Sequence, residues 1–275
     1  MVKIKILLEN YSINNLYKTK HGLSILIQLN NSNILLDVGP DNKFIRNADK
    51  MGINLQNVII LFLSHNHNDH TGGLNGFCRI NKTAPIYLMD DIKNRYYVKA
   101  KFLLFYIGSK LNKKYHSRII KIDNDLIIDK NIFLLKNSVN ENIKPTLNKL
   151  LFKKENGKII NDKFDHESIL VLEDNNELLI FNSCSHNGIL NIIETVKRKF
   201  PNKKIRSYIG GLHLGNAGVK FQESNEYLDF LAEKLRKLNI NIYTGHCTGK
   251  PVLNYLGQRL GNVVHEINTG MELDV

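Results

Sequence analysis

Two stretches of this chain repeat the same alternation of apolar runs and polar turns. In the first stretch, the mainly apolar runs 24–29 and 34–37 are separated by a turn rich in asparagine. In the second, the runs 168–172 and 178–182 flank a similar turn. Asparagine tolerates the left-handed backbone of tight turns, so each stretch predicts a β-hairpin of two apolar strands.

A helix and a further strand are predicted after each hairpin. Residues 43–51 and 187–200 are the helical candidates, and the second carries apolar residues at the spacing of one helix face. Apolar runs at 58–63 and 205–209 come next. Two similar halves of this kind predict a mixed α/β fold, a four-layer αββα sandwich of two mixed β-sheets packed face to face with the helices outside.

The middle of the chain does not fit this repeat. Between about residues 90 and 150, aromatic residues such as Tyr96 and Tyr97 alternate with basic stretches. We interpret residues 1–275 as a single domain with an insertion at about 90–150. The insertion is either a lid over a site or an extra structural hairpin or helix pair, and the sequence leaves both interpretations open.

The charge of the chain narrows the choice of partners. The formal net charge is +12, which by itself would suit nucleic-acid binding. The basic clusters carry few aromatic residues between the charges, and the chain is generally rich in Asn, Ile and Lys. We therefore favour a solvated basic surface and a small anionic substrate over nucleic acid. The sequence leaves a homo-oligomer open.

The same composition points to a cytoplasmic protein without a membrane partner. The chain contains no run of about 18 apolar residues, and its first residues alternate like a strand rather than a signal peptide. Its three cysteines are Cys78, Cys184 and Cys247. Three cysteines do not suggest a disulfide framework and agree with a reducing compartment.

The most closely spaced candidate metal ligands lie directly after a predicted apolar strand, in the segment 65–70. His65, His67, Asp69 and His70 form a His-x-His-x-Asp-His pattern. Neutral imidazole and carboxylate are the usual protein ligands of zinc and similar divalent ions. Side chains two positions apart in an extended segment point to the same side, so His65 and His67 can hold one ion. Asp69 and His70, where the backbone turns, can reach a second ion.

Three later loops place a histidine at the end of a predicted strand. These histidines are His186, His213 and His246, and glycines beside them allow the backbone to approach an ion closely. We predict His186 and His246 as metal ligands, whereas His213 is either a ligand or a catalytic residue in contact with substrate. Cys184 is a candidate thiolate ligand, with a small buried structural residue as the alternative, and Cys247 is expected to point away.

Residues of the first half and one histidine before the second hairpin complete the candidate set. Asp37 ends a strand next to Gly39 and is expected to orient a ligand imidazole by accepting its other N–H. His21 is expected to line the pocket. His166 is a weaker candidate ligand. All of these assignments require histidines from both halves of the chain to meet around the ions.

These motifs resemble those of a known superfamily. The pattern from His65 to His70, preceded by Leu36-Asp37-Val38-Gly39 and followed by Gly72-Gly73-Leu74, resembles the metallo-β-lactamase fold superfamily. A further set of motifs is similar to its 7,8-dihydropterin-6-methyl-4-(β-D-ribofuranosyl)-aminobenzene-5′-phosphate synthase-like subgroup, and lies at residues 21–24, 183–189, 210–214 and 245–249. Most hydrolases of the superfamily carry a Gly-Asp pair whose aspartate bridges two metals. Here Ser183-Cys184 stands in its place, so bridging falls to Cys184 or is absent.

The resemblance implies an enzyme with two divalent metal ions, zinc first, with manganese or iron as alternatives. Two adjacent ions activate a bridging water and stabilise negative charge, which predicts a hydrolase of an ester or a phosphate-containing small molecule. Asp69 would ligate one ion and accept the proton of the attacking water. The subgroup implies an alternative, a synthase in which an aryl amine displaces the diphosphate of a pterin-methyl diphosphate. A third hypothesis is a non-catalytic, metal-containing sensor of a small ligand.

Overall fold

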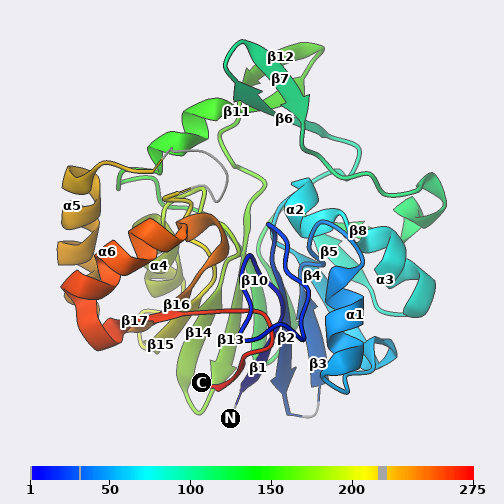
Figure 1. Ribbon diagram of the computed structural model, residues 1–275, viewed down its shortest axis with the longest axis horizontal. Coiled ribbons are helices and arrows are strands. Elements are labelled where there is room, and N and C mark those ends of the chain that lie inside the picture. The colour runs from blue at the N-terminus through cyan, green and yellow to red at the C-terminus, as the bar shows by residue number, and fades with distance from the viewer. Residues whose placement is uncertain (1, 31, 216–221) are drawn as a thin grey trace. The chain divides into compact units, whose positions relative to one another are not determined.

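The computed structural model describes residues 2–30, 32–215 and 222–275. It contains two compact units, which are described one at a time. Unit 1 comprises Met1–Asn124, Lys149–His166 and Asn268–Val275, and unit 2 comprises Asp125–Asn148 and Glu167–Ile267. Each unit is built on one seven-stranded mixed sheet that carries helices (Figure 1).

The main sheet of unit 1 has the strand order β18-β1-β2-β3-β4-β5-β8. Its strands are β1 (Lys3–Leu8), β2 (Ser24–Leu29), β3 (Ser32–Leu36), β4 (Val58–Leu63), β5 (Ile86–Leu88), β8 (Ile119–Lys121) and β18 (Glu272–Asp274). The strands from β3 to β8 run parallel, and the others pair antiparallel. Parallel strands end at the same edge of a sheet. The residues that follow β3 and β4, namely Asp37 and the segment from Ser64, therefore lie close together.

Helices cover one face of this sheet. They are α1 (Lys43–Lys50), α2 (Asn68–Thr71) and α3 (Leu74–Ile80), with the 3₁₀ turns η1 (Leu55–Asn57) and η2 (Lys113–Arg118). Phe44 of α1 and Phe77 of α3 are fully buried in one apolar cluster with Leu61 and Leu63 of β4. The alternate residues of β4 thus anchor the helices, which fixes where the strand ends and the histidine-rich segment begins.

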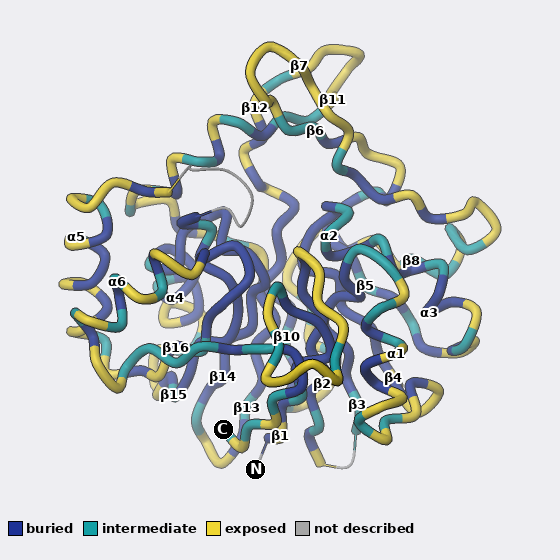
Figure 2. The backbone as a smooth tube through the Cα atoms, viewed as in Figure 1, coloured by how far each residue is buried: buried dark blue, intermediate teal, exposed yellow. Residues whose placement is uncertain are grey.

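A smaller antiparallel sheet of unit 1 has the order β12-β11-β6-β7. Its strands are β6 (Arg95–Ala100), β7 (Leu103–Tyr106), β11 (Leu151–Glu155) and β12 (Lys158–Asn161), and the 3₁₀ turn η3 (Thr146–Leu150) precedes β11. The edge strand β7 is exposed along its whole length (Figure 2). The hairpin β6–β7 agrees with the extra structural hairpin that was one interpretation of residues 90–150, whereas its sheet with β11 and β12 was not expected from the sequence. The proposed lid and the single-domain interpretation stay predictions.

The sheet of unit 2 has the order β17-β16-β15-β14-β13-β10-β9. Its strands are β9 (Leu126–Asp129), β10 (Ile132–Lys136), β13 (Ser168–Asp174), β14 (Glu177–Phe181), β15 (Lys204–Ile209), β16 (Asn241–Thr244) and β17 (Val264–Glu266). The strands from β14 to β17 are parallel, so the loops that follow β14, β15 and β16 leave the same edge of the sheet. Those loops carry Cys184, His213 and His246.

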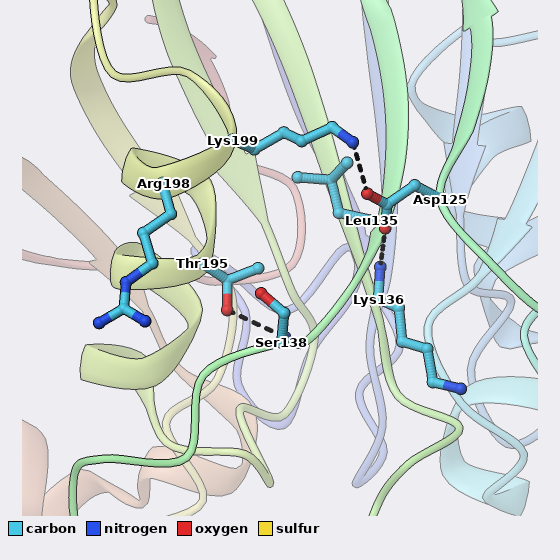
Figure 3. A pocket seen from close by; sticks show the side chains of 7 residues that line it. All are labelled: Asp125, Leu135, Lys136, Ser138, Thr195, Arg198 and Lys199. Carbon is cyan, nitrogen blue, oxygen red and sulfur yellow. Dashed lines mark hydrogen bonds and ion pairs between the residues drawn. The ribbon is translucent and has the colours of Figure 1, made fainter.

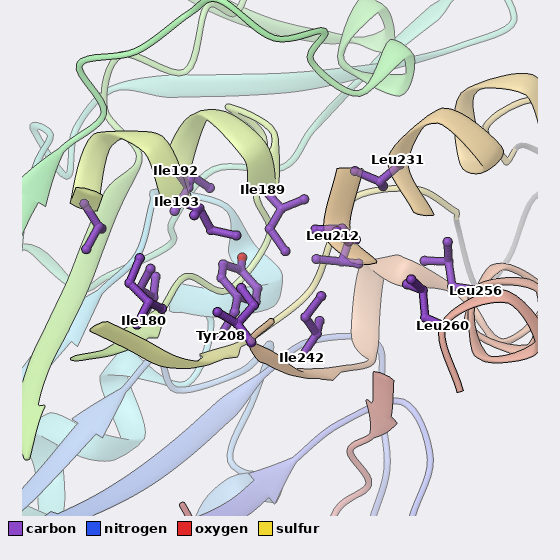
Figure 4. Close-up of a cluster of buried hydrophobic side chains, with 14 of the residues drawn as sticks. Ile180, Ile189, Ile192, Ile193, Tyr208, Leu212, Leu231, Ile242, Leu256 and Leu260 are labelled. Carbon is purple, nitrogen blue, oxygen red and sulfur yellow. The ribbon is translucent and has the colours of Figure 1, made fainter. Parts of the chain in front are cut away.

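The core of unit 2 lies between its sheet and its helices. The helices are α4 (Ile189–Lys199), α5 (Asn225–Arg236) and α6 (Lys250–Leu260), with the 3₁₀ turns η4 (His246–Thr248) and η5 (Gly261–Val263). Ile189 and Ile192 of α4 belong to the same buried cluster as Ile180 of β14 and Tyr208 of β15 (Figure 4). This packing explains the apolar face that the sequence shows in α4, and it fixes the loop between β14 and α4.

The mixed α/β fold class with two main mixed sheets is confirmed. The two predicted hairpins are β2–β3 and β13–β14, and their turns contain asparagines with left-handed backbones, Asn30 (φ 48°), Asn175 (φ 51°) and Asn176 (φ 65°). The predicted helices α1 and α4 are present within one or two residues of the expected ends. Among the described residues, no helix has the length and apolar character needed to cross a bilayer.

Candidate metal centre

The histidine-rich segment of unit 1 bends at residues 64–66 directly after β4 and then enters the single helical turn α2, so the extended segment expected there is absent around His65. His65 and His67 are buried before the helical turn, and Asp69 and His70 lie on α2. His65 Nε2 is 3.1 Å from His67 Nδ1, and His70 Nε2 is 3.4 Å from the Asp69 carboxylate. The rings of His65 and His70 lie 4.4 Å apart. The structure therefore brings together the four donors predicted from this segment.

Asp37 and Ser64 hold two of these imidazoles in one orientation. The buried Asp37 carboxylate accepts hydrogen bonds from the Ser64 N–H (2.8 Å) and the Ser64 hydroxyl (2.7 Å), and its Oδ2 is 2.7 Å from His70 Nδ1. Ser64 Oγ is in turn 2.9 Å from His65 Nδ1. If the Nδ1–H groups donate these bonds, Nε2 is the atom with which His65 and His70 would each ligate a metal ion. No role for Ser64 was predicted from the sequence.

The electrostatics of the segment favour neutral imidazoles at two positions. Burial lowers the pKa of His67 to about 3. Burial, together with the neighbouring His70 and His67, also lowers the pKa of His65 well below its ordinary value. Burial opposes a charge on His70 as well, but the carboxylates of Asp69 and Asp37 raise the pKa of His70 well above its ordinary value. Neutral imidazole is the form that ligates metals, and the lowered pKa values keep His65 and His67 in this form at neutral pH.

His21 lies beside the same turn. Its Nε2 is 3.5 Å from Asp69 Oδ2, and its side chain is 42% exposed. The adjacent Gly22 has φ +146°, and a Cβ at this position would lie 2.4 Å from the Asp69 carbonyl oxygen. A glycine is therefore required for the chain to pass so close to α2. The role of His21 as a pocket-lining residue stays a prediction.

His166 belongs to an aromatic group next to His67. The rings of Tyr96 and Phe164 lie 5.6 and 6.0 Å from the ring of His67, and Tyr96 lies 4.6 Å from the ring of His166. His166 Nε2 is 2.9 Å from the Asp162 carboxylate. This contact occupies Nε2 of His166, and the weaker candidacy of His166 as a ligand stays a prediction.

In unit 2, Cys184 lies at the centre of the donor residues. Its Sγ is within 4.8 Å of a ring nitrogen of His186, of His213 and of His246, and also of the Cys247 Sγ. The rings of His186 and His213 are 4.1 Å apart. The expectation that Cys247 points away from the other donors is wrong, because Gly211 offers no Cβ and leaves room for the sulfur.

Two residues that the sequence analysis did not single out hold His186. The Glu167 carboxylate accepts hydrogen bonds from the main-chain N–H of His186 (2.8 Å) and of Asn187 (2.9 Å). Asn148 donates to the His186 carbonyl oxygen at 2.7 Å, and its Oδ1 is 3.1 Å from His186 Nδ1. A hydrogen bond from Nδ1–H to Asn148 leaves Nε2 of His186 as the ligating atom.

The loops of unit 2 hold several residues in left-handed backbone conformations. Ser185, His213 and His246 have φ values of 55°, 52° and 51°. Such values are uncommon outside glycine and asparagine, and they persist where surrounding contacts fix them. The Ser185 hydroxyl, for example, contacts both the Tyr208 hydroxyl and the Gly211 carbonyl oxygen. The contacts therefore place the donor side chains by tertiary structure rather than by local preference.

A cavity elsewhere in unit 2 holds none of the donor residues. Its volume is about 190 Å³, and its lining residues are Asp125, Leu135, Lys136, Ser138, Thr195, Arg198 and Lys199 (Figure 3). Lys199 and Asp125 form an ion pair across it at 2.8 Å. Sites for small ligands usually have volumes of about 300 Å³ or more. This cavity is therefore a poor candidate for the substrate site.

The donor chemistry of both units suits divalent metals. Unit 1 offers imidazoles and a carboxylate, and unit 2 offers imidazoles and thiols, which together are the ligand types of zinc sites. The prediction that donors of both units bind the same two ions stays a prediction, as do the individual ligand assignments.

The chain is similar to several known proteins. The family model of the metallo-beta-lactamase superfamily matches residues 18–140. The chain is 32% identical, over 90% of its length and 88% of the relative's, to the 7,8-dihydropterin-6-methyl-4-(beta-D-ribofuranosyl)-aminobenzene-5'-phosphate synthase of Methanocaldococcus jannaschii. An uncharacterized protein of the same organism is 28% identical over 95% of this chain and 96% of its own. The crystal structure of a metal-dependent hydrolase of the beta-lactamase superfamily superimposes with a TM-score of 0.83 at 26% identity, covering 100% of this chain and 99% of the hydrolase.

Proposed function

The chain belongs to the metallo-β-lactamase superfamily, and from this premise we propose that it is a metal-dependent synthase that acts on small anionic substrates. The observation that carries the specific reaction is its similarity to the synthase over nearly the whole chain. The name of that relative describes a dihydropterin joined through a methyl group to an aminobenzene that bears a ribofuranosyl phosphate.

The proposed reaction is a displacement at carbon. The nitrogen of the aryl amine attacks the methylene carbon of a dihydropterin-methyl diphosphate, and a C–N bond forms. The C–O bond to the diphosphate breaks, and its electron pair leaves with the diphosphate. The amine loses one proton. The substrates are anionic, which suits the net charge of +12.

The candidate ligands in unit 1 are His65, His67, Asp69 and His70, and those in unit 2 are Cys184, His186 and His246. When bound, the ions would stabilise the negative charge that develops on the leaving diphosphate. Ser64 and Asp37 orient imidazoles of unit 1, Asn148 contacts the imidazole of His186, and Glu167 holds the main chain of His186. The Asp69 carboxylate, which is 25% exposed, is the group we assign to accept the proton of the amine.

Hydrolysis is the second candidate function. The structural similarity to a metal-dependent hydrolase along the full chain favours it. In this reaction a water molecule would take the place of the amine, and Asp69 would accept a proton from that water. An ester or a phosphate-containing small molecule would be the substrate.

One assay separates the two reactions. Purified full-length protein is incubated with zinc, a dihydropterin-methyl diphosphate and the aminobenzene ribofuranosyl phosphate, and the products are identified by mass spectrometry. A synthase forms the coupled product and releases diphosphate only when the amine is present. Equal release of diphosphate without the amine, with a hydroxymethyl pterin as product, would show the hydrolase. Tight metal binding without turnover of any of these substrates would leave the sensor hypothesis.

A matched pair of variants tests the role of the histidine-rich segment. His67→Ala removes a buried donor of unit 1 and should abolish product formation. His116→Ala removes a half-buried histidine of η2 whose Nε2 lies 3.2 Å from the Leu111 carbonyl oxygen, and should leave the rate unchanged. Equal rates for the two variants would argue against a catalytic metal at His67.

A further inference from the structure

We propose that Cys184, His213 and Cys247 form a site for one thiophilic divalent ion, such as zinc or cadmium, with two sulfur ligands and one imidazole. Cys184 is also a candidate ligand in the proposed function, so the inference adds a second sulfur and an imidazole to the chemistry of that residue. It also assigns His213, which the sequence left open between a ligand and a substrate contact, to metal binding.

The geometry of the three donors suits one ion. Their ligand atoms all lie within 4.8 Å of one another. In a tetrahedral zinc site with Zn–S distances near 2.3 Å and Zn–N distances near 2.1 Å, neighbouring ligand atoms are about 3.3 to 3.8 Å apart. The donors would therefore need to approach one another by at most about 1.5 Å, a shift within the reach of side-chain rotation.

Three neighbouring parallel strands of one sheet deliver these donors. Cys184 follows β14, His213 follows β15, and Cys247 follows β16. Main-chain hydrogen bonds tie the loops together, from the Gly211 N–H to the Ser183 carbonyl oxygen (2.9 Å) and from the Gly210 N–H to the Tyr243 carbonyl oxygen (2.9 Å). The site would therefore rest on the rigid edge of the sheet of unit 2.

The state of His213 points to an absent partner. Both ring nitrogens are buried, and neither has a hydrogen-bond partner among the residues that the structure describes. A buried imidazole without a partner is destabilising, because it has lost its hydrogen bonds to water without replacement. An ion at this position would bind one of these nitrogens.

The surroundings of Cys247 also suit a metal-bound sulfur. The His213 main-chain N–H donates a hydrogen bond to Cys247 Sγ at 3.2 Å, a contact that stabilises negative charge on sulfur. A Cβ at Gly211 would lie 2.4 Å from this sulfur, so the backbone of Gly211 closes around it. Both thiols are almost fully buried, with exposures of 3% for Cys184 and 5% for Cys247.

Two thiolates and an imidazole form the Cys₂His donor set of some zinc enzymes, in which the fourth position stays open. Soft sulfur ligands favour zinc over magnesium, calcium or manganese. The imidazole and carboxylate donors of unit 1 are less selective by this criterion. The two donor sets should therefore differ in the metals that they retain.

The test counts sulfur ligands directly. Metal-free, full-length protein is titrated with Cd²⁺, and the ultraviolet absorbance of thiolate-to-metal charge transfer is recorded. We expect Cys247→Ser to lower the saturating absorbance about twofold and His213→Ala to raise the Cd²⁺ dissociation constant at least tenfold. Cys78→Ser is the matched control, since Cys78 is buried in the apolar cluster of unit 1, and should leave the absorbance unchanged. The ¹¹³Cd NMR shift of the wild-type protein, which depends on the number of bound sulfurs, requires no substitution.

Each outcome has a distinct meaning. A shift typical of two sulfurs, together with the twofold loss in Cys247→Ser, supports the site. A one-sulfur shift with unchanged absorbance in Cys247→Ser overturns the inference and leaves Cys184 as a ligand in the proposed function. Absence of any thiolate signal overturns the inference and removes Cys184 from that function as well. Failure of the proposed reaction shows separately, as an absence of coupled product in the turnover assay.

Discussion

Replacing Asp37 by asparagine tests how the protein prepares a ligand imidazole. The Asp37 carboxylate is buried, accepts two hydrogen bonds from Ser64 and lies 2.7 Å from His70 Nδ1. Asparagine has the same shape and tolerates the left-handed backbone of this position, which has φ 56°. Its side-chain NH₂ group, however, is a donor where the carboxylate has an acceptor. When this NH₂ faces His70, it favours the tautomer with the proton on Nε2 and blocks the lone pair that a metal needs.

The size of the effect follows from these contacts. Loss of a residue that orients a metal ligand typically weakens metal binding by about 10-fold to 100-fold, which corresponds to about 1.4 to 2.8 kcal/mol. The fold should lose less, because charge-assisted hydrogen bonds are replaced by neutral ones at a cost of about 1 kcal/mol. A typical domain is stable by about 5 to 15 kcal/mol, so Asp37→Asn should remain folded.

Two measurements check this expectation. A chelator-competition titration gives the zinc affinity, and NMR correlations between ring nitrogens and ring protons give the tautomer of His70. Asp49→Asn, an exposed position on α1, removes the same charge and should match the wild-type protein in both measurements. An unchanged zinc affinity in Asp37→Asn, with the proton of His70 still on Nδ1, would refute the assigned role of Asp37.

Three further expectations concern individual contacts. Removing the metal with a chelator should abolish turnover, and added Zn²⁺ should restore it in the wild-type protein but not in His67→Ala; recovery in the variant would contradict the ligand role. Burial opposes charge on His166, but the hydrogen bond and charge of Asp162 raise the pKa of His166 above its ordinary 6.5. Burial alone would raise the pKa of Asp162, but the hydrogen bond and charge of His166 bring it below the ordinary 3.8. The pair should therefore contribute its full stabilisation between pH 3.8 and pH 6.5, the ordinary pKa values of the two groups. This stabilisation should decrease as pH falls through the folded-state pKa of Asp162 and as pH rises through the folded-state pKa of His166. An Asp162→Asn variant in which the pKa of His166, measured by NMR, is unchanged would contradict the expectation. Gly22→Ala should destabilise the protein by about 1 to 3 kcal/mol in a denaturant titration, because its positive φ and the tight contact with α2 are incompatible with a Cβ, and wild-type stability would contradict the strain.

Local sequence patterns are sufficient to predict the hairpins, two of the helices and the most concentrated donors. The hairpins β2–β3 and β13–β14 and the helices α1 and α4 follow from the periodicity of apolar residues and from the turn preference of asparagine, which are local properties of the chain. The donors His65, His67, Asp69 and His70 come from one short segment, so their proximity can be expected from its position directly after β4.

The distant residues that support those donors could be identified only from the folded structure. Asp37 meets His70 because β3 and β4 are parallel neighbours, and Cys247 meets Cys184 and His213 because β14, β15 and β16 end at one edge of a sheet. Strand order and register are long-range properties that arise from packing, and the sequence shows no local pattern for them. The direction of Cys247 in addition depends on the absence of a Cβ at Gly211, a steric effect between segments far apart in the chain.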